Sequence, residues 1–154
     1  MEKFPQLKVK EFMHKEFTSI PLGMTLRRVI EILSKSEMPG LPVVDNKRNL
    51  QGIITKRKII NLLLPRHLIR PSSWIGSLED MFPSGALYGN RGRLLLAEDV
   101  MDTRVRTVKE DTPLFEAAVS MEKENIEFLP VMRGEKIVGI ITQGDIMRAL
   151  FKIG

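Results

Sequence analysis

The sequence predicts an α/β fold in which a unit of strand, helix, strand, strand and helix occurs twice. The stretch LPVVDNKRNLQGIIT, which begins at Leu41, recurs as LPVMRGEKIVGIIT from Leu129. Each stretch follows a segment whose apolar residues recur at helical spacing, and each contains two short apolar runs, rich in β-branched residues, around a polar turn. Such self-similarity indicates a repeated structural unit, so we expect two halves of the same fold.

The two copies align along most of their length. Met13 aligns with Met101 at an offset of 88 residues, and the same offset relates the two Leu-Pro-Val sequences. Gly52 aligns with Gly139 at an offset of 87, because the second copy has one residue fewer in its polar turn. Turns tolerate a change in length at little cost, so the alignment supports the repeat.

The first helix of each unit is predicted over residues 25–36 and 112–124. In the first copy the pattern stands behind Thr25, a residue type that caps helix N-termini, and the second copy repeats it. The apolar residues that define the two patterns are Leu26, Val29, Ile30, Leu33, Leu114, Ala117, Ala118 and Met121. Each unit therefore contains one amphipathic helix.

Two strands and a second helix complete each unit. The strands are predicted over residues 41–44 and 50–54 in the first copy, and over 129–132 and 137–141 in the second. Helices then follow at residues 59–64 and 146–151, with Thr55 and Thr142 as their expected caps. Each unit therefore ends as a hairpin followed by a helix.

Composition limits the class of protein. The chain has 154 residues, of which 43% are apolar, so it is large enough to bury a core. It has no cysteine, no apolar run long enough to cross a membrane and a charged N-terminus, so we expect a cytoplasmic protein with no membrane partner. His14 and His67 have no partners at metal-ligand spacing, and no nucleophile with a base is apparent. We therefore expect neither a metal site nor catalysis.

Charge is unevenly distributed. Residues 1–64 contain 12 Lys and Arg against 6 Asp and Glu, whereas residues 97–154 contain 8 against 11. A basic half can meet a nucleic acid, another polyanion or the acidic half of a second chain, and it can equally be a solvated surface. The chain has few aromatic residues to stack on bases and no recognised nucleic-acid motif, so nucleic acid is not the favoured partner.

We divide the chain into residues 1–64, an insert at 65–96, and residues 97–154. The insert is rich in Pro and Gly, which predicts loops, but residues 74–82 show helical spacing around Trp74. We expect this short amphipathic helix to cover an edge of the fold or to meet a second chain. Arg91 and Arg93 stand in a basic turn that lacks the ending of a phosphate-binding loop.

The repeated Pro-Val and Gly-Ile-Ile-Thr sequences, each preceded by an EFM or DVM sequence and a helix, resemble the two halves of a CBS-domain pair, or Bateman module. The resemblance covers residues 9–64 and 97–151. It implies two β-α-β-β-α motifs packed through their sheets with pseudo-twofold symmetry, often dimerising into a disc. It also implies that adenine nucleotides or related adenosyl ligands bind in two clefts between the motifs.

The main ligand site is expected at the sequence Thr142-Gln143-Gly144-Asp145. A carboxylate can accept hydrogen bonds from both ribose hydroxyls, Thr142 adds a hydroxyl, and Gly144 leaves room at a helix N-terminus that favours anions. The same residues also fit a capping box that needs no ligand. The resemblance implies that the opposite motif supplies the wall around the base, which gives Thr18, Ile20, Met38 and Pro39.

The other cleft, at Thr55, is expected to be degenerate. It has Thr55 but carries Lys58 in place of the carboxylate, and an ammonium group cannot accept a hydrogen bond from ribose. Its residues by the same analogy are Thr55, Lys58, Arg106, Val108, Ile126 and Glu127. The basic turn at residues 56–58 could meet phosphates, either of a ligand or of an external polyanion, or it could simply be solvated.

The function that we infer is regulatory sensing of one adenosine-containing ligand by a homodimer, without catalysis. Candidate effectors are AMP, ADP, ATP, NAD and S-adenosylmethionine, and a client protein is not identified by the sequence. Some nucleotide-binding relatives carry a basic residue where this chain has Gly40 and Phe128, so an adenosyl ligand without phosphates stays open. The alternative is an interaction or nucleic-acid scaffold that uses the basic first half, with residues 142–145 as a helix cap only.

Overall fold

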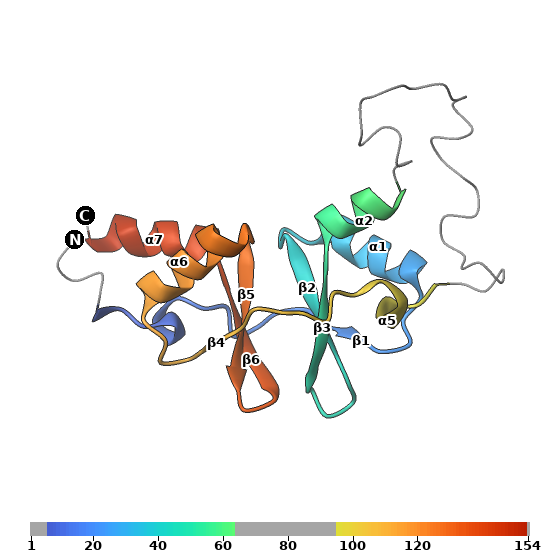
Figure 1. Cartoon of the computed structure of the whole chain (residues 1–154), viewed down its shortest axis with the longest axis horizontal. Helices are drawn as coiled ribbons and strands as arrows, with labels where there is room; N and C mark the ends of the chain where they lie inside the picture. Colours follow the sequence, from blue (N-terminus) through green and yellow to red (C-terminus); the bar gives the residue numbers. More distant parts are fainter. Residues whose placement is uncertain (1–5, 64–94, 154) are drawn as a thin grey trace, which may run out of the picture.

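The computed structural model describes residues 6–63 and 95–153. The first motif contains β1 (Ile20–Pro21), α1 (Leu26–Lys35), β2 (Gly40–Val44), β3 (Leu50–Thr55) and α2 (Lys56–Leu63). The second contains β4 (Val108–Lys109), α6 (Leu114–Glu124), β5 (Phe128–Arg133), β6 (Lys136–Thr142) and α7 (Gln143–Ile153). Short helices η2 (Val9–Glu11) and α5 (Ala97–Val100) precede the motifs. The predicted order of strand, helix, strand, strand and helix is confirmed in both (Figure 1).

Each motif has a three-stranded sheet with the same topology. The strand orders are β1-β2-β3 and β4-β5-β6, with the first pair of each sheet parallel and the second antiparallel. Ile20 pairs with Val43, and the equivalent Val108 pairs with Val131. The apolar runs at the centre of the sheets are buried from both sides, because one face packs on the motif's own helices (Figure 1) and residues such as Val44 and Ile140 pack between the motifs.

The predicted caps are mostly confirmed. The Thr25 hydroxyl accepts a hydrogen bond from Arg28 N at 3.3 Å, and the Thr55 hydroxyl accepts one from Lys58 N at 3.0 Å. The second copy differs, since α6 begins after Pro113 rather than at Thr112. Pro113 presets the backbone at a helix start, and the Thr112 hydroxyl instead accepts a hydrogen bond from Lys109 N at 3.0 Å within the preceding turn.

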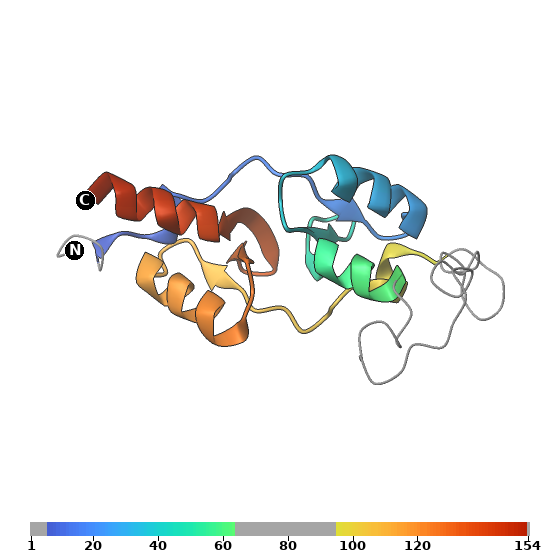
Figure 2. The same ribbon diagram turned by 90° about the horizontal axis from the view of Figure 1, so that it is seen from above.

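The segments that lead into the motifs are exchanged between them. The first leading segment, residues 7–14, packs on the second motif, where Val9 is fully buried beside Val108 and Leu114. The second leading segment, residues 95–102, packs on the first motif, where Ala97 and Val100 are buried. The chain then crosses back along opposite edges of the molecule, in blue and in yellow to orange (Figure 2). The core of each motif therefore includes the leading segment that precedes the other motif in the sequence.

A short backbone bridge fixes each exchanged segment. His14 N donates to Ile140 O at 2.8 Å and His14 O accepts from Ile140 N at 3.0 Å. Asp102 and Ile53 repeat this pair of bonds at 2.8 and 3.0 Å. At the crossing, a Cβ added to Gly52 would lie 2.7 Å from Asp102 O. The glycine of each Gly-Ile-Ile-Thr sequence is thus required by the close approach of another backbone.

The two motifs also meet through a shared apolar cluster. Val44 comes from the first motif and Phe128, Ile137 and Ile140 come from the second, and all four are buried. At the hairpin tips, Leu50 N donates to Glu135 O at 3.1 Å. The two hairpins consequently lie side by side at the centre of the long molecule (Figure 1).

Two expectations bear on parts of the chain outside this description. The helix predicted over residues 74–82, with Trp74, and the basic turn with Arg91 and Arg93 fall in residues 64–94, outside the described residues. Of the helices in residues 6–63 and 95–153, none has the length and apolar character needed to span a membrane.

A substitution at the crossing tests the exchange of leading segments. Gly52→Ala should lower the free energy of unfolding by about 1–3 kcal/mol, because the new Cβ would be 2.7 Å from Asp102 O and 2.8 Å from the Met101 sulfur. Gly144→Ala is the matched control, since its Cβ would meet only the Thr142 hydroxyl at 3.6 Å. Urea unfolding followed by circular dichroism measures both. Equal stability of the two variants would contradict the packing at Gly52.

Candidate functional site

The N-termini of α2 and α7 occupy equivalent positions beside the two crossings. In each case the last strand residue is a threonine, Thr55 or Thr142, and the fourth position of the turn is Lys58 or Asp145. Each turn therefore combines a capping hydroxyl with a charged side chain that faces the exchanged leading segment. The two clefts that we define here are the first cleft, at Thr55, and the second cleft, at Thr142.

In the second cleft, Asp145 forms a reciprocal cap with Thr142. Asp145 Oδ2 accepts hydrogen bonds from Thr142 N at 2.8 Å and from the Thr142 hydroxyl at 3.0 Å. Asp145 N in turn donates to the Thr142 hydroxyl oxygen at 3.3 Å. The capping interpretation of these residues is therefore geometrically correct, whether or not a ligand also binds there.

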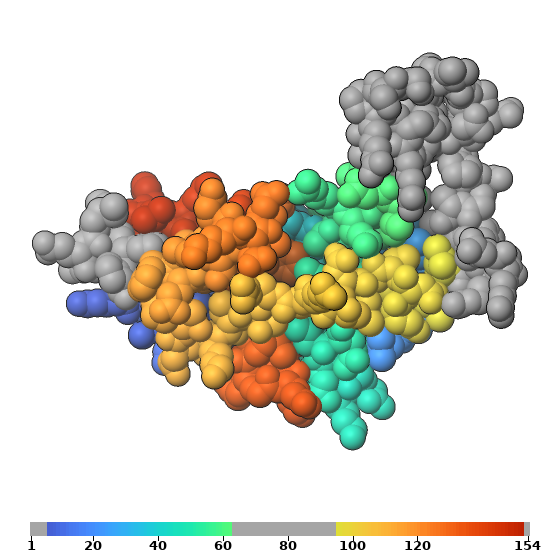
Figure 3. Space-filling view, viewed as in Figure 1, coloured from blue at the N-terminus to red at the C-terminus, as the bar shows by residue number. Residues whose placement is uncertain are grey.

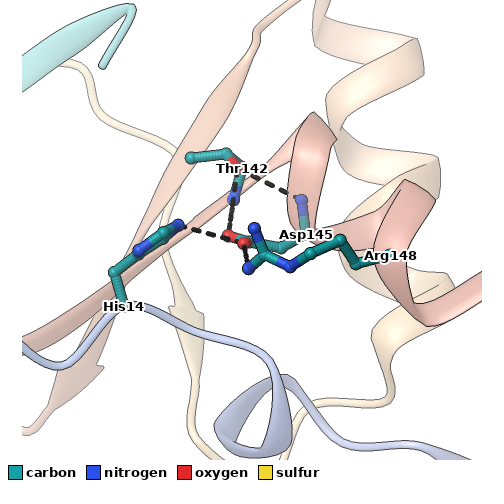
Figure 4. A network of polar contacts seen from close by, with 4 residues as sticks. All are labelled: His14, Thr142, Asp145 and Arg148. Atoms are coloured by element: carbon teal, nitrogen blue, oxygen red, sulfur yellow. Dashed lines mark hydrogen bonds and ion pairs between the residues drawn. The ribbon is translucent and has the colours of Figure 1, made fainter. Parts of the chain in front are cut away.

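The other oxygen of Asp145 is covered by two basic side chains (Figure 4). His14 Nε2 lies 3.0 Å from Asp145 Oδ1, and the Arg148 guanidinium donates to the same atom. The Asp145 side chain is 0% exposed, whereas those of His14 and Arg148 are 37% and 58% exposed. A ribose that binds Asp145 would thus have to displace His14 and Arg148, which lie between the carboxylate and solvent.

The first cleft repeats this arrangement with the charges exchanged. Lys58, at the position of Asp145, lies with Nζ 3.2 Å from Oδ1 of Asp102, which is at the position of His14. The side chains of this pair are 37% and 45% exposed. A polar side-chain contact between helix and leading segment is retained, but its carboxylate comes from the leading segment and remains accessible to solvent.

A cavity of about 1220 Å³ opens between the motifs at the first cleft. One wall is formed by Thr55 and the first turns of α2, and the opposite wall by the C-terminal end of α6 and residues 124–128. Residues 101–106 connect them, and all three elements come together on the face seen in Figure 3. Lys56, Arg57, Arg104 and Arg106 contribute positive charge to the lining.

The structure brings together most residues predicted for the first cleft. Thr55, Arg106, Ile126 and Glu127 line the cavity. Arg106 also pairs with Glu124 at 2.8 Å. Val108 is only 9% exposed and packs in the core of the second motif, so its contact with a ligand stays a prediction.

The residues predicted for the second cleft are more dispersed. Thr18 is exposed and lines a small hollow of about 270 Å³ with Ser36. Met38 packs half-buried between apolar clusters, and Pro39 lines the cavity of the first cleft. Ile20, like Val108, is an inward-facing strand residue in the core of its motif, and it is 0% exposed. Which of these residues contact a ligand stays a prediction.

Gly40 and Phe128, which stand where some relatives carry a basic residue, form one contact. A Cβ added to Gly40 would lie 2.8 Å from the Phe128 ring, which is 3% exposed. The two residues occupy equivalent positions in the repeat, and the aromatic ring of one fills the space left by the other. These two residues thus pack against each other between the motifs.

Sequence reasoning missed His14, Asp102 and Arg148. The signal was present in the repeat, because His14 aligns with Asp102 at the same offset that relates the two leading segments. Lys58 and Asp145 are likewise aligned with each other. At one pair of aligned positions the first copy has His14 and the second Asp102, and at the other pair the first copy has Lys58 and the second Asp145. The exchange suggests contact only once the leading segments are known to pack on the opposite motif.

Three comparisons place the chain among known proteins. The family model described as "CBS domain" matches residues 9–65 and 97–152. A CBS domain-containing protein of Dictyostelium discoideum is 30% identical over 146 residues, which cover 94% of this chain and 92% of that protein. Four other relatives are enzymes, and the chain spans only 13–24% of their lengths.

Solved structures agree with this assignment. The CBS domain pair of protein MJ0100, in complex with 5′-methylthioadenosine and S-adenosyl-L-methionine, is 25% identical, with a TM-score of 0.65 and coverage of 96% of this chain and 98% of that one. CBSX2 in complex with AMP shares the fold at 23% identity, with a TM-score of 0.71 and coverage of 95% and 97%. With two matched motifs, exchanged leading segments and this likeness, the chain belongs to the CBS-domain family as a CBS-domain pair.

Proposed function

We propose that the protein is a regulatory module that binds an adenosine-containing ligand between its two CBS motifs. The cavity of about 1220 Å³ at the first cleft carries the proposal that a ligand binds between the motifs, because its walls come from both motifs and its size accommodates a nucleotide. The assignment of a ribose contact to the second cleft rests instead on the Asp145 carboxylate and its bond to Thr142. The complex of MJ0100 with adenosyl compounds, at 25% identity, supports the ligand class. A ligand held by both motifs makes different contacts when the motifs change their arrangement relative to each other. Its binding can therefore favour one arrangement over another.

In the second cleft, Asp145 is the proposed acceptor of the ribose hydroxyls, with Thr142 and Gly144 beside it. The four cations that line the first cleft are replaced at equivalent positions by residues without positive charge, which are Gln143, Gly144, Glu16 and Thr18. The basic side chains of the second cleft, His14 and Arg148, already contact Asp145, so we propose an adenosyl ligand without phosphates for this cleft. S-adenosylmethionine is such a ligand, whereas AMP, ADP, ATP and NAD carry phosphates. The proposal is non-catalytic and includes a cytoplasmic location, which rests on the sequence alone.

His14 provides a route from ligand to conformation. It joins the first leading segment to Asp145 of the second motif at 3.0 Å, and its backbone is bonded to Ile140. Ribose hydroxyls that take the place of His14 would break the side-chain link and leave only the backbone bridge. Occupancy would then loosen the first leading segment on the second motif, which is a change between motifs rather than within one.

Calorimetric titration of ligand-free protein tests the second cleft. S-adenosylmethionine and 5′-methylthioadenosine should bind saturably, and Asp145→Asn should weaken both by about 10-fold to 100-fold, because an amide replaces a charged acceptor. His14→Ala should instead bind several-fold more tightly, since ribose no longer competes with the imidazole for the carboxylate. Lys123→Ala, an exposed substitution on α6, is the control and should change neither affinity.

Two outcomes would reject this assignment. If Asp145→Asn is folded and binds both compounds like the unaltered chain, residues 142–145 are a helix cap only. If no adenosine-containing compound binds, but a nucleic acid does with an affinity that falls steeply with salt, the interaction-scaffold function replaces the sensor. Unfolding curves for each variant separate loss of binding from loss of structure.

We also propose that the protein forms a homodimer through exposed apolar residues on its helices. Met147, Leu150 and Phe151 fall on one face of α7, with side chains 68%, 43% and 88% exposed. Phe115 and Val119 form a similar pair on α6 and are 40% and 45% exposed. A group of exposed apolar side chains of this kind is typical of an interaction surface, and a second copy is the partner that the family resemblance implies.

Light scattering coupled to size-exclusion chromatography tests the dimer. The chain should elute with twice its monomer mass, and Phe151→Ser with Met147→Ser should reduce the mass to that of a monomer, because the apolar contact is lost. Lys109→Ser, away from these two helices, should leave the mass unchanged. A monomer at all concentrations for the unaltered chain would contradict the proposal.

A further inference from the structure

Each leading segment has two similar binding surfaces available to it, one on each motif. On the second motif, Lys8 forms an antiparallel bridge with Pro113, and on the first motif Leu96 forms the equivalent bridge with Thr25. Lys8 aligns with Leu96, and Thr25 aligns with Pro113, at the same offset of 88 residues. The backbone contacts of a leading segment are therefore the same on either motif, and they do not determine which motif it binds.

The length of the connection to β1 does not determine the choice either. Residues 15–19 link the first leading segment to β1, and five extended residues span up to roughly 17 Å. β1 and β3 are the two edges of one three-stranded sheet, and strand spacing places such edges about 10 Å apart. The first leading segment could thus reach Ile53 of its own motif, which is equivalent to the residue that it contacts on the second motif.

The charged residues at the two crossings distinguish these arrangements. In the observed arrangement, His14 Nε2 lies 3.0 Å from the Asp145 carboxylate (Figure 4), and Lys58 Nζ lies 3.2 Å from the Asp102 carboxylate. His14 aligns with Asp102, and Lys58 aligns with Asp145. If each leading segment bound its own motif, Asp102 would therefore meet Asp145, and His14 would meet Lys58. Both complementary contacts would be lost, and two carboxylates would be placed together.

The meeting of the two carboxylates is the costlier of these mismatches. The Asp145 side chain is 0% exposed, and Arg148 supplies one positive charge for what would be two carboxylates. A buried charge without its own partner is strongly destabilising. Lys58 is 37% exposed, so solvent screens its interaction with a basic neighbour. The choice of motif thus depends mainly on whether His14 or Asp102 faces Asp145.

We propose that His14, Lys58, Asp102 and Asp145 direct each leading segment to the opposite motif. Each motif accepts the segment with the complementary side chain and disfavours the segment that precedes it in the sequence. The same selection applies between two copies of the chain, where a first motif would accept a leading segment only from another first motif's partner half, residues 95–102. The proposal requires no ligand, so it stands or falls independently of the proposed function.

Two pairs of introduced cysteines report the arrangement, because the chain has no cysteine of its own. Lys8→Cys with Pro113→Cys reports the observed arrangement, since antiparallel partners lie within the Cα separation of a disulfide. Lys8→Cys with Thr25→Cys reports binding of the first leading segment to its own motif. In a glutathione buffer, the effective concentration of the first pair should exceed that of the second by about 100-fold or more in the full chain.

An exchange of charged residues tests what sets this ratio. His14→Asp together with Asp102→His keeps the composition but places a carboxylate opposite Asp145, so the ratio should fall by about 10-fold or more. Side-chain size is the competing explanation, because Val9 and Ala97 occupy equivalent buried positions. Val9→Ala together with Ala97→Val is the matched control and should change the ratio less. An undiminished ratio after the charge exchange, or an equal fall in the control, would overturn the proposal.

A charge reversal at the first crossing decides the matter if the charge exchange prevents folding. Lys58→Asp and Asp102→Lys each place like charges together, so each should lower the urea midpoint of unfolding. The double variant should recover at least half of the summed loss, because its two side chains are again complementary. Lys58→Asn removes the attraction without adding repulsion and should lower the midpoint less than Lys58→Asp. Losses that simply add in the double variant would overturn the role of charge.

Discussion

The exchange of leading segments is the constraint on which the rest of the structure depends. Residues 7–14 complete the core of the second motif and residues 95–102 complete that of the first. A domain of this size has little apolar surface to spare, so a motif without its exchanged segment would expose the interior of its sheet and helices. The pair must therefore fold together, although each motif has its own sheet.

The exchange also determines which residues can define a binding site. Because the crossing backbone lies directly on Gly52 or Gly139, the residue after the crossing methionine is brought to the N-terminus of α2 or α7. Position 14 therefore meets position 145, and position 102 meets position 58. Charge at one of these positions constrains charge at the other. The local environment of each helix N-terminus thus depends on a segment far away in sequence.

The sequence was sufficient for the elements and their order because those depend on local spacing. Helical spacing in residues 25–36 and the paired apolar runs are properties of neighbouring residues, and their ends differ from the structure by a few positions at most. The exchange of leading segments was not predictable in this way, because periodicity contains no information about which sheet a segment packs on. The start of α6 shows the same limit for a single residue. Thr112 suggested the helix start, but the helix begins after Pro113.

The candidate site was only partly predictable for a related reason. Analogy placed Ile20 and Val108 in ligand walls, which stays a prediction. The structure adds that both are inward-facing strand residues at equivalent positions, and that each packs in the core of its own motif. Analogy also treated Lys58 as the loss of a function, because it compared one position at a time. A pair of aligned positions was needed to see that a carboxylate remains in the first cleft.

Two clefts joined to the same crossing segments cannot be independent. In the second cleft, the His14 link competes with the proposed ribose contact, so ligand binding there weakens the attachment of the first leading segment to the second motif. That segment continues into β1 of the first motif, and Ile20 of β1 shares its core with Ala97 and Val100 of the second leading segment. Asp102 follows in the same leading segment and is bonded to Ile53 of β3. Suppose that a ligand at one cleft favours one arrangement of the two motifs, and that this arrangement alters affinity at the other cleft. Linkage then requires that each ligand change the affinity of the other by the same factor. The Asp145 carboxylate is fully buried beneath His14 and Arg148, whereas the Asp102 carboxylate is 45% exposed, so the two clefts are unequal in that coupling.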